Sequence, residues 1–156
     1  MGFVIVLVYA PFAGWDGVPD PLGWALVIAG LVALRRRLRG ADTLLVVTAL
    51  AALVSVVTYP PGVTADIDPS LGWVLSLPQL AFCILMCGAL APDAEDLAGR
   101  FAALRWVYLA LAVIPVLVYG GGLDALALPM TVVVRLAGIY FVYLLFRVSK
   151  RPFALP

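Results

Sequence analysis

The chain has no histidine among its 156 residues. Histidine is the commonest general base near neutral pH and the commonest metal ligand in proteins. The sequence also shows no Ser-Lys or Cys-His arrangement of the kind that activates a nucleophile. We therefore predict that the protein is not an enzyme, and that it has no catalytic residues, no metal site and no cofactor.

Charged residues are scarce as well. They make up 12% of the chain, whereas hydrophobic residues make up 65%, and the mean hydropathy is +1.12. A soluble domain of this length cannot bury so much apolar surface, because ordinary domains are about half apolar and about a quarter charged. The composition therefore predicts that lipid surrounds most of the chain. No hydrophilic stretch is long enough to fold separately, so we expect one integral-membrane domain over residues 1–156, and the net charge of +1 gives no indication of a nucleic-acid partner.

Cysteine occurs only twice, at Cys83 and Cys87, inside an apolar run, which argues against a disulfide framework. The two thiols share a helical stripe with Ser76 and Gln79. A Cys-x₃-Cys pair could hold a soft metal, but two thiolates without further ligands leave such a site incomplete. The preferred interpretation is a small, polarizable face that packs against a neighbouring helix.

Long apolar runs separated by short polar turns account for the rest of the sequence. Lipid cannot satisfy open strand edges, and nothing alternates as barrel strands do, so these runs predict helices. The first run is shorter than the roughly 20 residues that a spanning helix needs, and it lacks the basic start of a signal peptide, so we expect a short, retained first helix. We predict an all-α polytopic membrane protein of about six transmembrane helices, arranged as three helical hairpins. The predicted helices cover Phe3 to Phe12, Pro21 to about Leu38, about Thr43 to Tyr59, Pro69 to Leu90, about Leu104 to Tyr119, and a last helix from between Ala125 and Met130 to about Val148.

Basic residues fall on one side of the membrane if six segments alternate. The other side then holds aspartates and no lysine or arginine, and the positive-inside rule makes the basic side cytoplasmic. This pattern predicts a protein of the bacterial cytoplasmic (inner) membrane with both termini cytoplasmic. The basic residues are Arg35, Arg36, Arg37, Arg39, Arg100, Arg105, Arg147, Lys150 and Arg151.

The polar segment from Ala91 to Arg105 has a helical pattern of its own. Asp93 is suited to cap a helix start, and Leu97, Phe101 and Leu104 share one face. We expect a short interfacial helix on the inner leaflet, which serves as an interface anchor or, alternatively, docks a partner.

Two similar turns, Val18 to Trp24 and Ile67 to Trp73, each enter a predicted helix through an Asp-Pro pair. Aspartate at a helix N-cap accepts hydrogen bonds from free amides, and proline suits the first helical position. The tryptophans are expected to anchor the helix ends at the interface. The two copies lie 49 residues apart, and both internal duplication and common capping chemistry account for them. Four aspartates at this face could bind a divalent cation if they converge: Asp16, Asp20, Asp66 and Asp68. Capping already explains two of these four.

The first of these turns carries a resemblance. Pro19-Asp20-Pro21-Leu22-Gly23-Trp24-Ala25-Leu26 resembles the helix-entry motif Pro-Asp-x-Leu/Ile-Gly-Trp/Tyr of small uncharacterised polytopic bacterial membrane proteins. The resemblance covers the first two predicted helices only. It implies a helix entry at this point and no activity, cofactor or catalytic residue.

Arg135 is the one formal charge that falls within a predicted spanning helix. Such a group is costly in lipid and is a candidate functional residue by default. Thr131 and Gly138 lie on its helical face, and the arginine could reach towards Asp20 and Asp68 or towards Asp124. One interpretation is a structural ion pair with the turns; the other is an anion or headgroup site beneath helix N-termini. The candidate ligand-binding residues are Arg135, Thr131, Gly138, Asp20, Asp68 and Gln79.

Two functions follow from these observations. The first is a non-catalytic accessory or assembly subunit of a membrane complex, or a lipid-interacting bundle, because polar groups within the membrane are few and packing faces are common. Its partners would be the lipid bilayer and other membrane subunits or a second copy of the chain. The second is a small transporter or an anion-binding component with an outward-facing site near Arg135.

Overall fold

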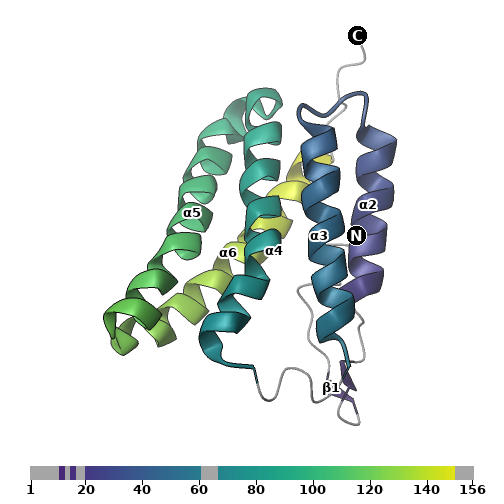
Figure 1. Ribbon diagram of the computed structural model, residues 1–156. Helices are drawn as coiled ribbons and strands as arrows, with labels where there is room; N and C mark the ends of the chain where they lie inside the picture. The colour runs from purple at the N-terminus through teal and green to yellow at the C-terminus, as the bar shows by residue number, and fades with distance from the viewer. Residues whose placement is uncertain (1–10, 13–14, 17–19, 61–66, 150–156) are drawn as a thin grey trace.

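A computed structural model gives the fold at residues 11–12, 15–16, 20–60 and 67–149 (Figure 1). Five α-helices dominate it, and each turns back beside the one before it. Short 3₁₀ helices precede α5 and α6. The helices are α2 (Asp20–Leu34), α3 (Ala41–Thr58), α4 (Pro69–Leu90), α5 (Ala98–Gly121) and α6 (Ala127–Ser149), and the 3₁₀ helices are η1 (Ala91–Asp93), η2 (Glu95–Leu97) and η3 (Asp124–Leu126).

Four of the five helices are long and apolar enough to cross a bilayer, namely α3, α4, α5 and α6 together with the 3₁₀ turns next to α4 and α5. The fifth, α2, has 15 residues and is shorter than a full span. By length and composition the protein is therefore a small multi-pass helical membrane protein, and its apolar helices contact lipid.

The predicted count of six helices is wrong for the part of the chain that the structure describes, which holds five. The predicted first helix, Phe3 to Phe12, lies outside the described residues except for its last two. Those two, Pro11–Phe12, form strand β1 instead, which pairs antiparallel with β2 (Trp15–Asp16). Proline fixes φ and removes a donor, so it suits the end of a short strand better than a helix interior.

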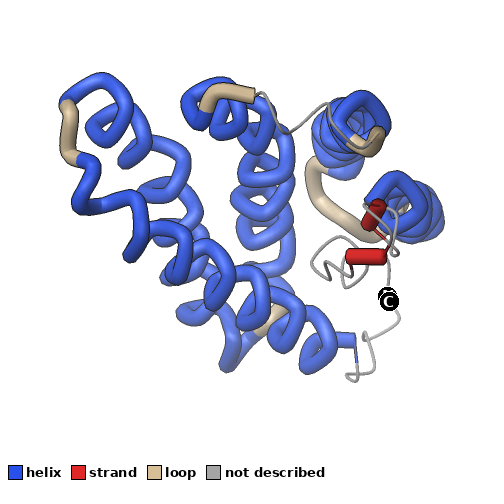
Figure 2. The backbone as a smooth tube through the Cα atoms, turned by 90° about the horizontal axis from the view of Figure 1, so that it is seen from below, coloured by secondary structure: helices blue, strands red, loops and turns tan. Residues whose placement is uncertain are grey.

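The alternation of the helices creates two distinct ends of the bundle. At one end, which we call the Asp-Pro end, α2 and α4 begin with Asp20-Pro21 and Asp68-Pro69, and α3 and α5 finish there. Figure 2 looks at this end and shows the short strand pair beside the helix termini. The other end, which we call the arginine end, carries Arg35–Arg39, Arg100 and Arg147.

At the arginine end, α2 stops at Leu34, four residues before its predicted end. Three consecutive arginines follow, and Gly40 adopts φ 70° before α3 begins. Glycine readily takes a left-handed conformation, so the chain turns here. Arg35 Nε donates to Asp42 Oδ1 at 2.7 Å across the turn, and both side chains are exposed.

The segment before α5 does not form the predicted interfacial helix. It forms η1, η2 and the first turns of α5, which starts at Ala98 rather than near Leu104. Leu97, Phe101 and Leu104 are buried in the bundle core, and Asp93 caps no helix start. The apolar stripe is continuous with the face of α5 that packs on α4, so it is buried by the neighbouring helix and not by lipid headgroups.

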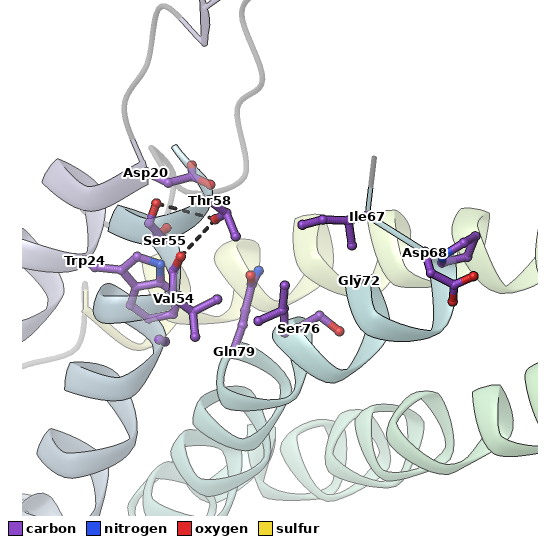
Figure 3. A pocket seen from close by; sticks show the side chains of 13 residues that line it. Asp20, Trp24, Val54, Ser55, Thr58, Ile67, Asp68, Gly72, Ser76 and Gln79 are labelled. Carbon is purple, nitrogen blue, oxygen red and sulfur yellow. Dashed lines mark hydrogen bonds between the residues drawn. The ribbon is translucent and has the colours of Figure 1, made fainter. Parts of the chain in front are cut away.

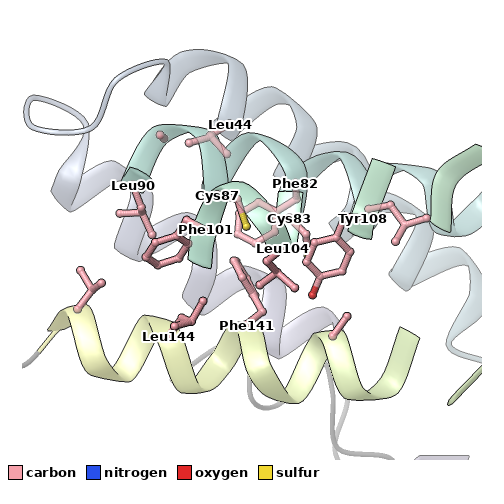
Figure 4. Close-up of a cluster of buried hydrophobic side chains, with 14 of the residues drawn as sticks. Leu44, Phe82, Cys83, Cys87, Leu90, Phe101, Leu104, Tyr108, Phe141 and Leu144 are labelled. Atoms are coloured by element: carbon pink, nitrogen blue, oxygen red, sulfur yellow. The ribbon is translucent and has the colours of Figure 1, made fainter. Parts of the chain in front are cut away.

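The core is built around Phe141 of α6, which is fully buried (Figure 4). Its ring meets Phe82 of α4 and Tyr108 of α5 edge to face, with centroids 6.5 Å and 6.0 Å away. Phe82 in turn meets Trp24 of α2 edge to face at 5.5 Å. A chain of aromatic contacts therefore joins four of the helices, and Trp24 lies in the core instead of anchoring the interface as predicted.

Cys83 and Cys87 are both buried and free in this core. Their position agrees with the predicted packing face on α4. Among the described residues, no group of three His, Cys, Asp or Glu side chains lies close enough together to hold a metal ion.

The second Asp-Pro turn has the predicted capping geometry. Asp68 is the N-cap of α4, Pro69 follows at the first helical position, and Asp68 Oδ1 accepts from the Ser70 amide at 2.8 Å and from the Ser70 hydroxyl. Asp20 is the first residue of α2, where its carboxylate lies in the favourable first turn. The capping interpretation of the turns is therefore confirmed at Asp68.

This cap makes stability depend on pH. The hydroxyl and the amide of Ser70 hold the pKa of Asp68 below its ordinary value of 3.8. A carboxyl whose pKa is lower when folded stabilises the protein above its unfolded pKa, and the contribution is lost as the pH falls through the folded value. We expect Asp68→Asn, which keeps the cap but removes the charge, to weaken the fall in melting temperature between about pH 5 and about pH 2. Asp93→Asn, which removes a charge at the arginine end, is the control; an equal change in both variants would contradict this assignment.

Candidate functional site

Three of the six predicted site residues, Asp20, Asp68 and Gln79, line one cavity (Figure 3). It lies between α2, α3 and α4 at the Asp-Pro end and has a volume of about 320 Å³. We call it the Asp-Pro cavity. Its other lining residues are Trp24, Ala51, Val54, Ser55, Thr58, Ile67, Pro69, Gly72, Leu75 and Ser76.

The local sequence explains how the cavity is built. Each Asp-Pro pair starts a helix, so Asp20 and Asp68 are held at the mouth by the first turns of α2 and α4. The last turn of α3 supplies Ser55 and Thr58, and α3 runs in the opposite direction to α2 and α4. Gln79 lies nearly three turns into α4. The capping chemistry that shapes the helix ends therefore also places two carboxylates beside a hollow.

The hydroxyls in this cavity differ in how they are satisfied. Thr58 donates to the carbonyl of Val54 at 2.9 Å, and Ser76 donates to the carbonyl of Trp73 at 2.7 Å. Ser55 is 9% exposed, and its hydroxyl makes no hydrogen bond to any residue that the structure describes. The side-chain amide of Gln79 also has none among the described residues. Ser55 and Gln79 are thus the polar groups of the cavity that the protein itself leaves unsatisfied.

Arg135, Thr131 and Gly138 lie elsewhere. They belong to α6, and they line none of the three cavities known for the described residues. Arg135 makes no ion pair or hydrogen bond within the described chain, so the predicted ion pair with Asp20 or Asp68 is wrong. The predicted site is therefore two separate places, the Asp-Pro cavity and the region around Arg135.

The three α6 residues do not share one environment either. Gly138 is buried, whereas Arg135 is exposed and Thr131 is exposed with its hydroxyl on the carbonyl of Ala127 at 3.0 Å. A step of three residues advances about 300° around a helix, so Gly138 is about 60° away from Arg135. The boundary between the packed and the unpacked side of α6 therefore lies between Arg135 and Gly138.

The region around Arg135 has an unusual property for a helix in a bundle. All six residues from Thr131 to Leu136 are exposed, including Val132 at 50% and Leu136 at 60%. Six residues complete more than one turn of 3.6 residues, so no side of this turn is covered by the rest of the described chain. We call these six residues the exposed turn of α6.

A second cavity, of about 280 Å³, lies between α4 and α5 near the arginine end. The guanidinium of Arg105 lies over Gly88, with Nη1 3.4 Å from the position that a Cβ atom would take. In the sequence, Arg105 served only as one of the basic residues that indicate the cytoplasmic side. Nothing in the sequence indicated that a glycine on another helix makes room for its side chain. The lining residues are Cys87, Gly88, Ala91, Pro92, Ala102, Arg105, Trp106 and Leu109.

No protein-family model matches the chain, and no curated protein or solved structure is similar to it. Function must therefore be argued from the geometry of the two places described above. The Asp-Pro cavity presents carboxylates and unsatisfied polar groups, and the exposed turn of α6 presents a cation in an apolar helix.

Proposed function

We propose that this protein is an accessory or assembly subunit of a complex in the bacterial cytoplasmic membrane, without catalytic machinery of its own. The observation that supports this proposal is the exposed turn of α6, with the unpaired Arg135 at its centre. A protein that works alone in lipid gains nothing from an uncovered cation within a spanning helix.

The position of Arg135 along α6 makes its exposure costly. It lies eight residues after the first residue of a 23-residue helix, so it is about 12 Å along an axis of roughly 34 Å. Arginine near the centre of a spanning helix costs about 2.5–3.5 kcal/mol on insertion scales. α6 crosses the bundle at an angle (Figure 1), which brings Arg135 somewhat nearer to the membrane surface than its distance along the helix. A complementary anion is what offsets this cost.

The chain itself has no suitable carboxylate. None of its nine Asp and Glu residues falls in the interior of a candidate span, and the one nearest to a helix interior, Asp42, is the second residue of α3 and pairs with Arg35. A second copy of the chain would bring another Arg135 and no mid-span anion. Charge complementarity therefore favours a different subunit whose transmembrane helix carries Asp or Glu, over a homo-oligomer.

The arrangement of charge supports the proposed orientation. Arginines at the ends of α2, α5 and α6 lie at one end of the bundle, and the positive-inside rule makes that end cytoplasmic. In the proposed orientation the end of α6 is cytoplasmic. The cytoplasmic position of the N-terminus depends on the predicted first helix, which lies outside the described residues, and the resemblance of Pro19–Trp24 to a bacterial helix-entry motif supports the proposed membrane.

The alternative function, an anion-binding or transporting component centred on Arg135, receives less support from the geometry. Arg135 lines none of the three cavities described for residues 20–60 and 67–149, and the cavity that contains three of the predicted residues is lined by two carboxylates. A solute-binding role would therefore concern the Asp-Pro cavity and a ligand of the opposite charge.

The subunit proposal is tested with photo-crosslinking residues placed at Val132 and Leu136, on either side of Arg135, in intact membranes. We expect one adduct, to a protein with Asp or Glu inside a transmembrane segment. Arg135→Gln should lower its yield at least about tenfold, which corresponds to about 1.4 kcal/mol. Arg147→Gln removes the same charge near the end of α6 and should leave the yield unchanged.

A crosslinker at Val46, on an exposed face of α3, controls for random contact in the membrane. Adducts formed only with lipid would assign Arg135 to headgroup binding and would contradict the subunit role. Adducts between two copies of the chain would equally contradict a heteromeric partner.

A further inference from the structure

We propose that the Asp-Pro cavity binds a small organic ammonium ion, which enters from the Asp-Pro end of the bundle. The proposal is independent of the subunit role, because it depends on α2, α3 and α4 and on no residue of α6. Three observations carry it: unsatisfied polar groups, a negative local charge, and a size and shape suited to a small ligand.

The first observation is the hydroxyl of Ser55. It is nine-tenths buried, it lines the cavity, and it has no hydrogen-bond partner (Figure 3). Thr48 and Thr58 of the same helix, by contrast, each donate to the carbonyl four residues earlier. The Ser55 hydroxyl is therefore available to a ligand or ordered water in the cavity.

Gln79 adds a second group of the same kind from α4. Its amide lines the cavity without a protein hydrogen bond, and its oxygen is an acceptor available to an N–H donor. Polar side chains within spanning helices are rare, and they mark ligand pathways when they face a cavity. Ser55 and Gln79 approach the hollow from two different helices, so a single bound molecule between α3 and α4 can meet both.

The second observation is the sign of the local charge. Asp20 and Asp68 line the cavity, and no lysine or arginine does. Each carboxylate lies at a helix start, which carries about +0.5 of a charge, while the end of α3 contributes about −0.5. The dipoles therefore reduce the negative potential without reversing it, and a cation is attracted where an anion is repelled.

The third observation is what the cavity can hold. Its volume of about 320 Å³ is at the small end of ligand pockets, and its apolar walls include Trp24, Val54 and Leu75. A bare divalent ion is a poor fit, because the described residues place no three carboxylate or thiol ligands together, and Asp68 Oδ1 already accepts from Ser70. An ammonium group attached to a short apolar body matches both the acceptors and the walls.

The experiment uses three probes of nearly the same shape, benzylamine, benzyl alcohol and benzoate, with the full-length protein in lipid nanodiscs near pH 7. We expect benzylamine to raise the melting temperature in a saturable way, while the neutral and anionic probes do not. An equal shift with benzoate, or no saturable shift with benzylamine, would overturn the proposal.

Variants locate the site. Asp20→Asn and Ser55→Ala should each weaken benzylamine binding, the former at least tenfold, whereas Asp42→Asn at the arginine end should bind as the wild type does. Because Asp20→Asn also alters a helix start, Gly72→Leu provides a second variant that blocks the cavity without removing a charge. A Cβ at Gly72 would meet only the side chain of Ile67, at 3.9 Å, so the helix accepts it and the new side chain fills the mouth of the cavity.

Gly72→Leu should therefore keep the melting temperature of the unliganded protein and abolish the benzylamine shift. Unchanged benzylamine binding in both Gly72→Leu and Asp20→Asn would place the probe elsewhere and refute this site. Loss of benzylamine binding without any change in crosslinking at Val132 and Leu136 would separate this cavity from the subunit role.

Discussion

Replacing Phe141 by alanine is expected to lower the free energy of unfolding by about 3 kcal/mol, the low end of the range for a buried phenylalanine. The ring is fully buried and contacts Phe82 and Tyr108 edge to face, so its removal opens a cavity where three helices meet. The low end applies because an unfolded membrane protein stays in lipid. The lost stability then comes mainly from van der Waals packing, and the free energy of transfer from water to an apolar environment contributes little. Reversible unfolding in mixed micelles measures the change.

Phe146→Ala is the matched control for this substitution. Phe146 lies on the same helix as Phe141, and its substitution removes the same ring. Its side chain, however, is 39% exposed and contacts lipid. We expect it to change the free energy of unfolding by less than about 0.5 kcal/mol, as substitutions away from packed sites usually do. Equal losses for the two variants would show that Phe141 is not a packing centre.

Replacing Arg135 by leucine is expected to favour membrane insertion of α6 by about 3 kcal/mol. Arginine near a helix centre costs about 2.5–3.5 kcal/mol on the insertion scale, whereas leucine contributes about −0.3 to −0.6 kcal/mol. This difference corresponds to a change of roughly 100-fold or more in the insertion equilibrium. A glycosylation-mapping assay of α6 placed in a reporter protein measures the inserted fraction directly.

Arg147→Leu serves as the control, because Arg147 lies two residues before the end of α6. An arginine near a helix end extends its guanidinium to the headgroups, so its removal should change insertion far less. Equal changes for the two variants would indicate that Arg135 also reaches the headgroups, and would remove the energetic reason for a partner subunit.

The expected effects of Arg135 on insertion and on assembly have opposite signs. The leucine variant should insert better, while the glutamine variant should crosslink less to its partner. A residue that is unfavourable for the isolated chain and favourable for the complex is what an accessory subunit requires, because an unassembled copy is then less stable in the membrane than an assembled one.

Much of the fold was predictable from local chemistry. The apolar runs predicted helices because lipid leaves the backbone no other way to satisfy its hydrogen bonds. The bounds of α4 agree with the predicted ones, since Asp68-Pro69 is a strong local start signal and its cap is made within two residues. The segregation of the arginines at one end also depends only on the order of helices and turns.

The burial of individual residues was less predictable. Trp24 was expected at the interface but lies in the core beside Phe82, and Leu97 and Phe101 were expected on lipid but pack under α4. In a soluble protein, hydrophobicity separates core from surface. In lipid both faces of a helix are apolar, so composition does not tell which face contacts protein.

The candidate site shows the same division. Residues set by local rules, Asp20 and Asp68, were identified from the Asp-Pro pairs, and Gln79 was identified from the helical stripe that it shares with Ser76, Cys83 and Cys87. Ser55 was missed, because a serine near the end of α3 looks like any other small residue until α2 and α4 enclose it. The proposed link from Arg135 to the aspartates failed because nothing in a sequence gives the distance between two helices.

By itself, the sequence determined the environment of this protein, its helical class, the helix starts at the Asp-Pro pairs and the gathering of arginines at one end. Each of these follows from composition or from interactions between residues that are neighbours in the chain. Only the tertiary structure decided that the Asp-Pro pairs share a cavity, that Ser55 faces into it unpartnered, and that Arg135 lies apart from both on an exposed turn of α6. Those facts depend on how helices pack, and between helices of nearly uniform hydrophobicity the packing is decided by the fit of side chains and not by their polarity.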